Sequence, residues 1–162
     1  MNNNNINELW DEVTPKLYGY LVSILHDRAV ADDILQSTWL KAIEALPRFQ
    51  DRGFGMSPWL FMIARNECKQ HWRKDGRELP FDQLLHDKQE DNGRQEDKIF
   101  IDQILSRVSS DDRELIRLRY IADLSLSDIA KLLKINPITA RVRMHRAIKN
   151  TKLIIQNHNY EK

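Results

Sequence analysis

Residues 125–149 read SLSDIAKLLKINPITARVRMHRAIK, and this stretch predicts two helices separated by a short break. Ser125 can cap the first helix, and Asp128, three residues later, completes a capping-box pattern. Apolar residues then recur at the spacing of one buried helical face: Ile129, Leu132 and Leu133. Asn136 and Pro137 form a cap and first-turn pair that can open the second helix. The stretch therefore predicts a helix-turn-helix.

The second of these helices has an apolar face and a polar face. The residues expected to point inward are Ala140, Met144, Ala147 and Ile148. Those left for the outer face are Thr139, Arg141, Val142, Arg143, His145 and Arg146. Between Lys131 and Lys152 every charged residue is basic. Arginine pairs with guanine edges in the major groove and lysine contacts phosphates, so this helix is predicted to bind DNA. The alternative is an amphipathic hairpin whose charges only meet water.

Composition sets the broad class of the protein. The chain has 162 residues, 41% of them hydrophobic and 30% charged, which is typical of a soluble globular protein with one domain or two small ones. The net charge is only +1, but residues 78–97 hold seven acidic against two basic residues, while the last third is basic. This asymmetry indicates different partners for different segments. Cys68 is the only cysteine, which excludes a disulfide framework and favours a reducing cytoplasm. No apolar run approaches the roughly 20 residues that membrane insertion needs.

The periodicity predicts helices at about 7–25, 28–46 and 57–74, with Pro15 marking a bend or a break in the first. Ser57 and Pro58 are expected to open the third helix, and Ser110 to cap a later one. No β-branched alternating run of useful length occurs, so the fold is predicted to be all-α. We expect two small helical domains, residues 6–75 and 98–155, joined by a flexible acidic linker, residues 76–97.

The third predicted helix carries a second basic face. Arg65, Lys69 and Arg73 are spaced four residues apart, and the preceding loop supplies Phe49 and Phe54, with Trp59 following. Cations that follow phosphates and rings that stack on bases are typical of single-stranded nucleic acid binding. The alternative is that the rings belong to the core and the cations to a solvated surface.

The second predicted helix has a mixed stripe away from its core face. Asp33, Gln36 and Leu40 lie at positions i, i+3 and i+7. An exposed leucine among polar neighbours can mark a docking surface for another protein, or it can be an ordinary surface leucine.

Taken together, these segments resemble the extracytoplasmic-function sigma factors, the smallest members of the sigma-70 family. Residues 33–42 (DILQSTWLKA) resemble region 2.2, and residues 58–66 (PWLFMIARN) resemble regions 2.3 and 2.4. Residues 124–130 (LSLSDIA) and 139–147 (TARVRMHRA) resemble region 4.2. The resemblance covers about residues 9–153. It implies a helical bundle formed by region 2 and a helix-turn-helix formed by region 4.

The resemblance also implies roles for particular residues. Asn66, with Phe49 and the loop up to Ser57, would take a base flipped out of the −10 element. The opened −10 strand would be supported by Trp59, Phe61, Arg65 and Lys69. Bases of the −35 element would face Arg141, Val142, His145 and Arg146, and its phosphates Thr139 and Arg143. Core RNA polymerase would bind Asp33, Gln36, Trp39 and Leu40.

The resemblance implies three partners: core RNA polymerase, promoter DNA as a −35 duplex and a −10 single strand, and an anti-sigma factor. The chain departs from the family at Lys134, where glycine is usual at the turn, at Met62, where a basic residue is common, and at Val142, which favours contact with a thymine methyl group. These changes affect the promoter sequence that is read.

Two other classes of protein compete with this interpretation. One is a stand-alone helix-turn-helix regulator, with residues 1–75 as a dimerisation or sensing bundle. The other is an enzyme. Five scattered histidines, one cysteine and no phosphate-binding loop offer no metal site, nucleophile triad or nucleotide cradle, so we expect no catalytic residues, no metal and no cofactor.

Overall fold

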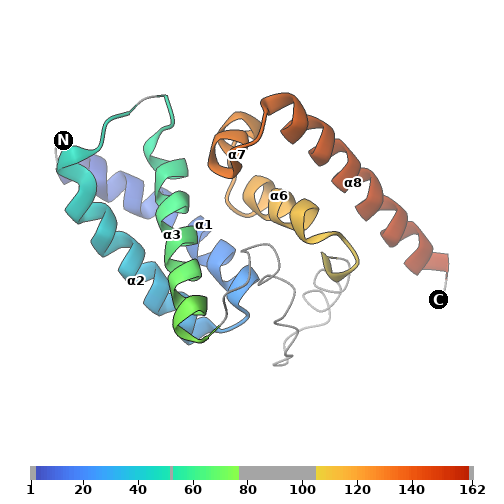
Figure 1. Ribbon diagram of the computed structural model, residues 1–162, viewed down its shortest axis with the longest axis horizontal. Helices are drawn as coiled ribbons and strands as arrows, with labels where there is room; N and C mark the ends of the chain where they lie inside the picture. The colour runs from blue at the N-terminus through green and yellow to red at the C-terminus, as the bar shows by residue number, and fades with distance from the viewer. Residues whose placement is uncertain (1–2, 52, 77–104, 161–162) are drawn as a thin grey trace.

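The computed structural model describes residues 3–51, 53–76 and 105–160, and these residues form helices and connecting segments without a β-strand. Figure 1 shows them in chain order: α1 (Asn3–Leu25), α2 (Arg28–Ala45), the short 3-10 helix η1 (Leu46–Arg48), α3 (Met56–Lys74), α6 (Ser110–Tyr120), α7 (Leu126–Leu133) and α8 (Pro137–Tyr160). The all-α prediction is confirmed. Of the predicted linker 76–97 only Gly76 is described, and residues 98–104 of the second predicted domain also lie outside the described residues.

Helices α1, α2 and α3 form the N-terminal bundle. Their inner faces bury a row of large apolar side chains: Val13, Leu17, Leu21, Ile24, Leu25, Leu60 and Trp72. Helix α1 continues through Pro15 as one helix, so of the predicted bend or break the break does not occur. The bundle thus presents α2 and α3 as rigid supports for the residues on their outer faces.

The loop before α3 is ordered by one carboxylate. Asp51 Oδ1 accepts the backbone N–H groups of Gly53 at 2.8 Å, Phe54 at 3.2 Å and Gly55 at 3.3 Å. Gly55 precedes the helix with φ 73° and offers no side-chain cap, so the prediction that Ser57 caps α3 is wrong. The left-handed backbone at Gly53 (φ 76°) and Gly55 lets three successive amides turn toward Asp51, a conformation that glycine adopts without strain.

The C-terminal unit contains the predicted helix-turn-helix as α7 and α8. Ser125 caps α7 by accepting the amide of Asp128 at 3.1 Å, as predicted. The turn places Lys134 in the left-handed region (φ 56°) without a glycine. Asn136 Oδ1 then accepts the amide of Ile138 at 2.8 Å and opens α8. Helix α6 is capped by Ser109, one residue before the predicted Ser110.

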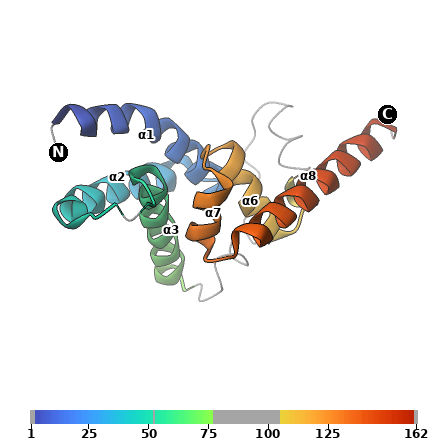
Figure 2. The same ribbon diagram turned by 90° about the horizontal axis from the view of Figure 1, so that it is seen from above.

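The two units lie side by side, with α6 and α7 next to the N-terminal bundle and α8 on the far side (Figures 1 and 2). Leu115 and Leu118 of α6 are fully buried in the same apolar cluster as Tyr20 of α1. A Cβ added at Gly19 would meet Ile121 Cγ2 at 3.3 Å, so glycine permits a close approach of the two units here. Lys16 and Asp123 form an ion pair of 3.1 Å across the same boundary. The units therefore share one packed interface.

Candidate nucleic-acid interface

The outer face of α8 is open to solvent. Thr139, Arg141, Val142 and His145 are all exposed, and 63% of the surface of Val142 is accessible. The opposite face is held against the rest of the unit by three buried residues: Ala140, Met144 and Ala147. These four outer residues lie on one side of a helix that is anchored from behind, as the sequence predicted. A major groove can accept such a helix.

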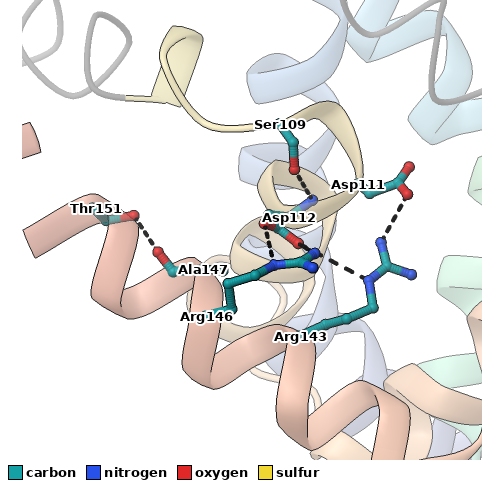
Figure 3. A network of polar contacts seen from close by, with 7 residues as sticks. All are labelled: Ser109, Asp111, Asp112, Arg143, Arg146, Ala147 and Thr151. Carbon is teal, nitrogen blue, oxygen red and sulfur yellow. Dashed lines mark hydrogen bonds and ion pairs between the residues drawn. The ribbon is translucent and has the colours of Figure 1, made fainter. Parts of the chain in front are cut away.

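The two remaining arginines of the predicted −35 set contact acidic side chains at the start of α6 (Figure 3). Arg146 donates to Asp112 from Nη2 at 2.8 Å and from Nε at 3.3 Å. Arg143 pairs with Asp111 at 3.1 Å and lies 4.0 Å from Asp112. The hydrogen bond and charge of Asp112 raise the pKa of the Arg146 guanidinium. The side chain of Arg146 is nevertheless 58% exposed, whereas that of Arg143 is 20% exposed and lies toward α6.

The start of α3 brings two predicted aromatic residues together. The ring centroids of Phe49 and Trp59 lie 4.7 Å apart with the ring planes tilted by 45°, and both residues are partly accessible. Asn66 and Lys69 are exposed farther along α3. The Asp51 carboxylate holds the loop between the two rings, and the amides of Gly55 and Gly53 lower its pKa. The loop between Phe49 and Trp59 is thus ordered by local hydrogen bonds.

Arg65, the central cation of this predicted site, lies between the two units. Its Nη1 contacts Glu114 Oε1 of α6, and the same oxygen accepts the hydroxyl of Tyr20 at 2.6 Å. The Arg65 side chain is only 13% exposed and that of Glu114 is 5% exposed. Burial alone would lower the pKa of Arg65, but the Glu114 charge and Tyr20 raise it, so the guanidinium stays charged. Burial and the Glu114 charge raise the pKa of Tyr20 well above its ordinary value, so its hydroxyl stays protonated and donates.

A second contact brings α7 to the loop before α3. Lys131 donates from Nζ to the backbone carbonyl of Gly53. Together with Glu114, it places the C-terminal unit over part of the surface that the sequence assigns to the −10 strand.

Two predicted contact residues are core residues in the structure. Phe61 is fully buried because it belongs to the inward face of α3. It packs edge-on against Tyr20, with the ring centroids 5.4 Å apart. Trp39 is 4% exposed and packs against Trp10, with the ring centroids 4.6 Å apart. Both therefore lie beneath the surfaces to which the family resemblance assigned them. We correct their assignment from direct contact to support of the helices that carry the contacts.

The other residues of the predicted polymerase-binding face lie on the surface of α2. Asp33 and Gln36 are exposed, and Leu40 is 63% exposed. Sequence reasoning missed the exposure of Ile43 on α2 and of Trp10 on α1, which are 53% and 43% exposed. The i, i+3 spacing of Leu40 and Ile43 was the signal available for the first.

Sequence reasoning also missed Asp112 and Glu114, the acids that meet Arg146 and Arg65. The signal was present as acids in the first turns of a helix that precedes a basic segment. Spacing alone does not reveal it, because the partners are 34 and 49 residues away.

Among the residues that the structure describes, no helix combines the length and apolar composition that crossing a bilayer requires. The same part of the chain holds no group of three or more histidine, cysteine, aspartate or glutamate side chains suited to a metal ion.

Comparison with known proteins identifies the family. The Sigma-70 region 2 model matches residues 9–78, and the Sigma-70 region 4 model matches residues 101–150. The RNA polymerase sigma-H factor of Pseudomonas aeruginosa is 30% identical over 149 residues, which cover 82% of this chain and 76% of the relative. The ECF RNA polymerase sigma factor SigC of Mycobacterium tuberculosis is 31% identical over 132 residues, 78% of this chain and 70% of the relative.

A solved structure matches both units at once. The sigma factor RpoE from Bartonella quintana, in complex with the anti-sigma factor NepR, has a TM-score of 0.71 and 25% identity, covering 94% of this chain and 98% of that one. The region 2 match covers the N-terminal bundle. The alternative of a stand-alone regulator does not predict such a match. The chain therefore belongs to the sigma-70 family, as an RNA polymerase sigma factor of the extracytoplasmic-function type that binds core polymerase and promoter DNA.

Proposed function

We propose that α8 reads the −35 element through its outer face. Arg141, Val142, His145 and Arg146 contact bases, and Thr139 and Arg143 contact phosphates. The observation that carries this proposal is the exposure of all these residues except Arg143 on one side of a helix whose other side is buried. Arg143 is the least exposed of them, so its phosphate contact requires its side chain to turn away from Asp111.

The loop before α3 and the exposed face of α3 receive the −10 strand. Phe49 and Trp59 frame the site for a flipped base, Asn66 contacts its polar edge, and Lys69 follows the phosphates. Flipping a base costs a few kcal/mol, and stacking contributes about 1–3 kcal/mol per base. Two rings and one amide can therefore offset the free energy that flipping costs.

Contact between Arg65 and the −10 strand requires the two units to separate. Glu114 occupies Arg65, and Lys131 lies against the loop at Gly53, so the packed arrangement covers part of the −10 surface. Separation is favoured by one defect of the interface. Glu114 Oε2 is buried without a hydrogen-bond partner among the described residues, which costs free energy in the packed form.

Core polymerase binds the exposed surface of α2 formed by Asp33, Gln36 and Leu40, supported from beneath by Trp39. An anti-sigma factor is the third partner, because the RpoE chain that this fold matches over both units is bound to one. We place the protein in the cytoplasm, where core polymerase works, and assign it no catalytic residue.

The proposed function is tested by run-off transcription with purified chain, core polymerase and a library of promoter templates. We expect initiation from a defined subset of templates that share two elements, and none from core polymerase alone. Initiation from no template would overturn the proposal. Tight binding of the free chain to a palindromic duplex would instead favour a stand-alone regulator.

A further inference from the structure

Asp112 is nearly inaccessible to solvent, yet it contacts the exposed arginine of the recognition helix. Its side chain is 3% exposed, while that of Arg146 is 58% exposed. The carboxylate lies in the first turn of α6, whose cap Ser109 accepts the Asp112 amide at 3.3 Å. Figure 3 shows dashed lines from Asp112 to both arginines of α8, Arg146 and Arg143. The backbone of α6 therefore fixes its position.

The ion pair with Asp112 uses only some of the N–H donors of Arg146 and leaves the others available to a base. A guanidinium carries five N–H donors in a planar fork. Asp112 takes the side edge of that fork, formed by Nε and Nη2, at 3.3 Å and 2.8 Å. Guanine is read by two parallel N–H donors that accommodate its O6 and N7. Those donors come from the far end of the fork, where Nη1 and the second N–H of Nη2 lie.

An ion pair of this geometry orients the arginine before DNA arrives. A free arginine side chain must lose its rotamer freedom when it pairs with a base, and an ordered one has already done so. We propose that Asp112 is a positioning residue for −35 recognition, because it holds Arg146 with its end-on donors directed away from α6. This inference rests on the proposed role of Arg146 in the −35 element.

The test compares Asp112→Asn with Asp111→Asn in the holoenzyme. Both changes remove one acid from the start of α6, but only Asp112 contacts Arg146. Binding is measured on duplexes that carry each single-base change in the −35 element. We expect Asp112→Asn to reduce the preference at the one or two base pairs read by Arg146 about fivefold, and Asp111→Asn to leave it unchanged.

Two further variants separate positioning from a purely structural role. Arg146→Lys keeps the charge and leaves the buried acid paired, but it removes the planar fork, so we expect it to lose the same base preference. The double variant Asp112→Asn with Arg146→Ala should show no less preference than Arg146→Ala alone, since both act on one contact. If Asp112→Asn does not fold, Asp112→Glu, which keeps the charge but moves the carboxylate by one methylene, replaces it in the same comparison with the same expected loss of preference.

Equal weakening on all −35 sequences, or an unchanged preference in Asp112→Asn, would overturn the inference. Either result would make the pair a scaffold contact between α6 and α8. If the unmodified holoenzyme shows no base preference in the −35 element at all, the proposed function of α8 fails instead, so the two failures are distinguishable.

Discussion

Arg65 on α3 and Arg146 on α8 are both predicted DNA contacts, and each meets an acid from the same helix. Glu114 contacts Arg65, and Asp112, two residues earlier on α6, contacts Arg146. The exposure of the two arginines differs greatly: 13% of the Arg65 side chain is accessible, compared with 58% for Arg146. By our proposals, the first acid covers a nucleic-acid contact, while the second supports one.

The difference follows from where each acid lies. Glu114 points from α6 into the boundary between the two units, where Tyr20 also donates to it. Asp112 points within the C-terminal unit toward α8. A contact between units is lost when the units move apart, whereas a contact within one unit is kept. On the proposed roles, the same type of ion pair therefore blocks DNA in one place and prepares for it in another.

Among the changes that test this difference, removal of the Glu114 charge should have the largest effect on DNA binding. Breaking one partner of a buried ion pair typically costs about 3–5 kcal/mol, and here the cost falls on the packed arrangement of the units. In Glu114→Gln we expect the free chain to bind a −10 single strand at least about tenfold more tightly, equivalent to about 1.4 kcal/mol. Fluorescence anisotropy with a labelled oligonucleotide measures this directly.

Glu67→Gln is the matched control. Glu67 is also a buried acid, but it lies on α3 and contacts Ser37 and Lys41 of α2, within the N-terminal bundle. It changes the net charge by the same amount without touching Arg65. If both variants raise strand binding equally, the effect comes from net charge, and Glu114 does not cover the site.

A smaller effect is expected for Asn66→Ala, which tests the neighbour of Arg65 that the C-terminal unit leaves exposed. A lost hydrogen bond to a flipped base contributes about 1 kcal/mol, so opening of a fully paired −10 element should slow about fivefold. The measurement is open-complex formation on paired and pre-melted templates. The −35 duplex affinity should not change. Equal losses on both templates would remove Asn66 from strand opening.

The elements of the fold were predictable because their signals are local. The cap at Ser125, the left-handed turn at Lys134 and the start of α8 at Pro137 each depend on neighbours within a few residues. The outer face of α8 followed from its helical period. All of its six predicted contact residues except Arg143 are exposed, and two of the six, Arg143 and Arg146, pair with acids of α6.

The errors arose where distant residues decide exposure. Phe61 and Trp39 stand in segments with a recognisable pattern, yet Tyr20 and Trp10 of α1 cover their rings. Glu114 and Arg65 meet across 49 positions of sequence. Helical periodicity shows which face turns inward. It does not show which outer face a second unit covers, because that depends on packing between units.

The smallest expected effect concerns Gly19, where α1 approaches the residue after α6. In a helix interior alanine is more favourable than glycine by about 1 kcal/mol, so Gly19→Ala should stabilise α1 in isolation. In the packed arrangement the new Cβ would lie 3.3 Å from Ile121 Cγ2, and the Ile121 side chain must move by a few tenths of an ångström to accommodate it. We therefore expect little net change in the free energy of unfolding of the unmodified chain. In the Glu114→Gln background, where we expect the units to separate, we expect a gain of about 0.8–1 kcal/mol. Denaturant unfolding of the four chains of this cycle measures the coupling. Equal effects of Gly19→Ala in both backgrounds would mean that Glu114 does not hold the units together.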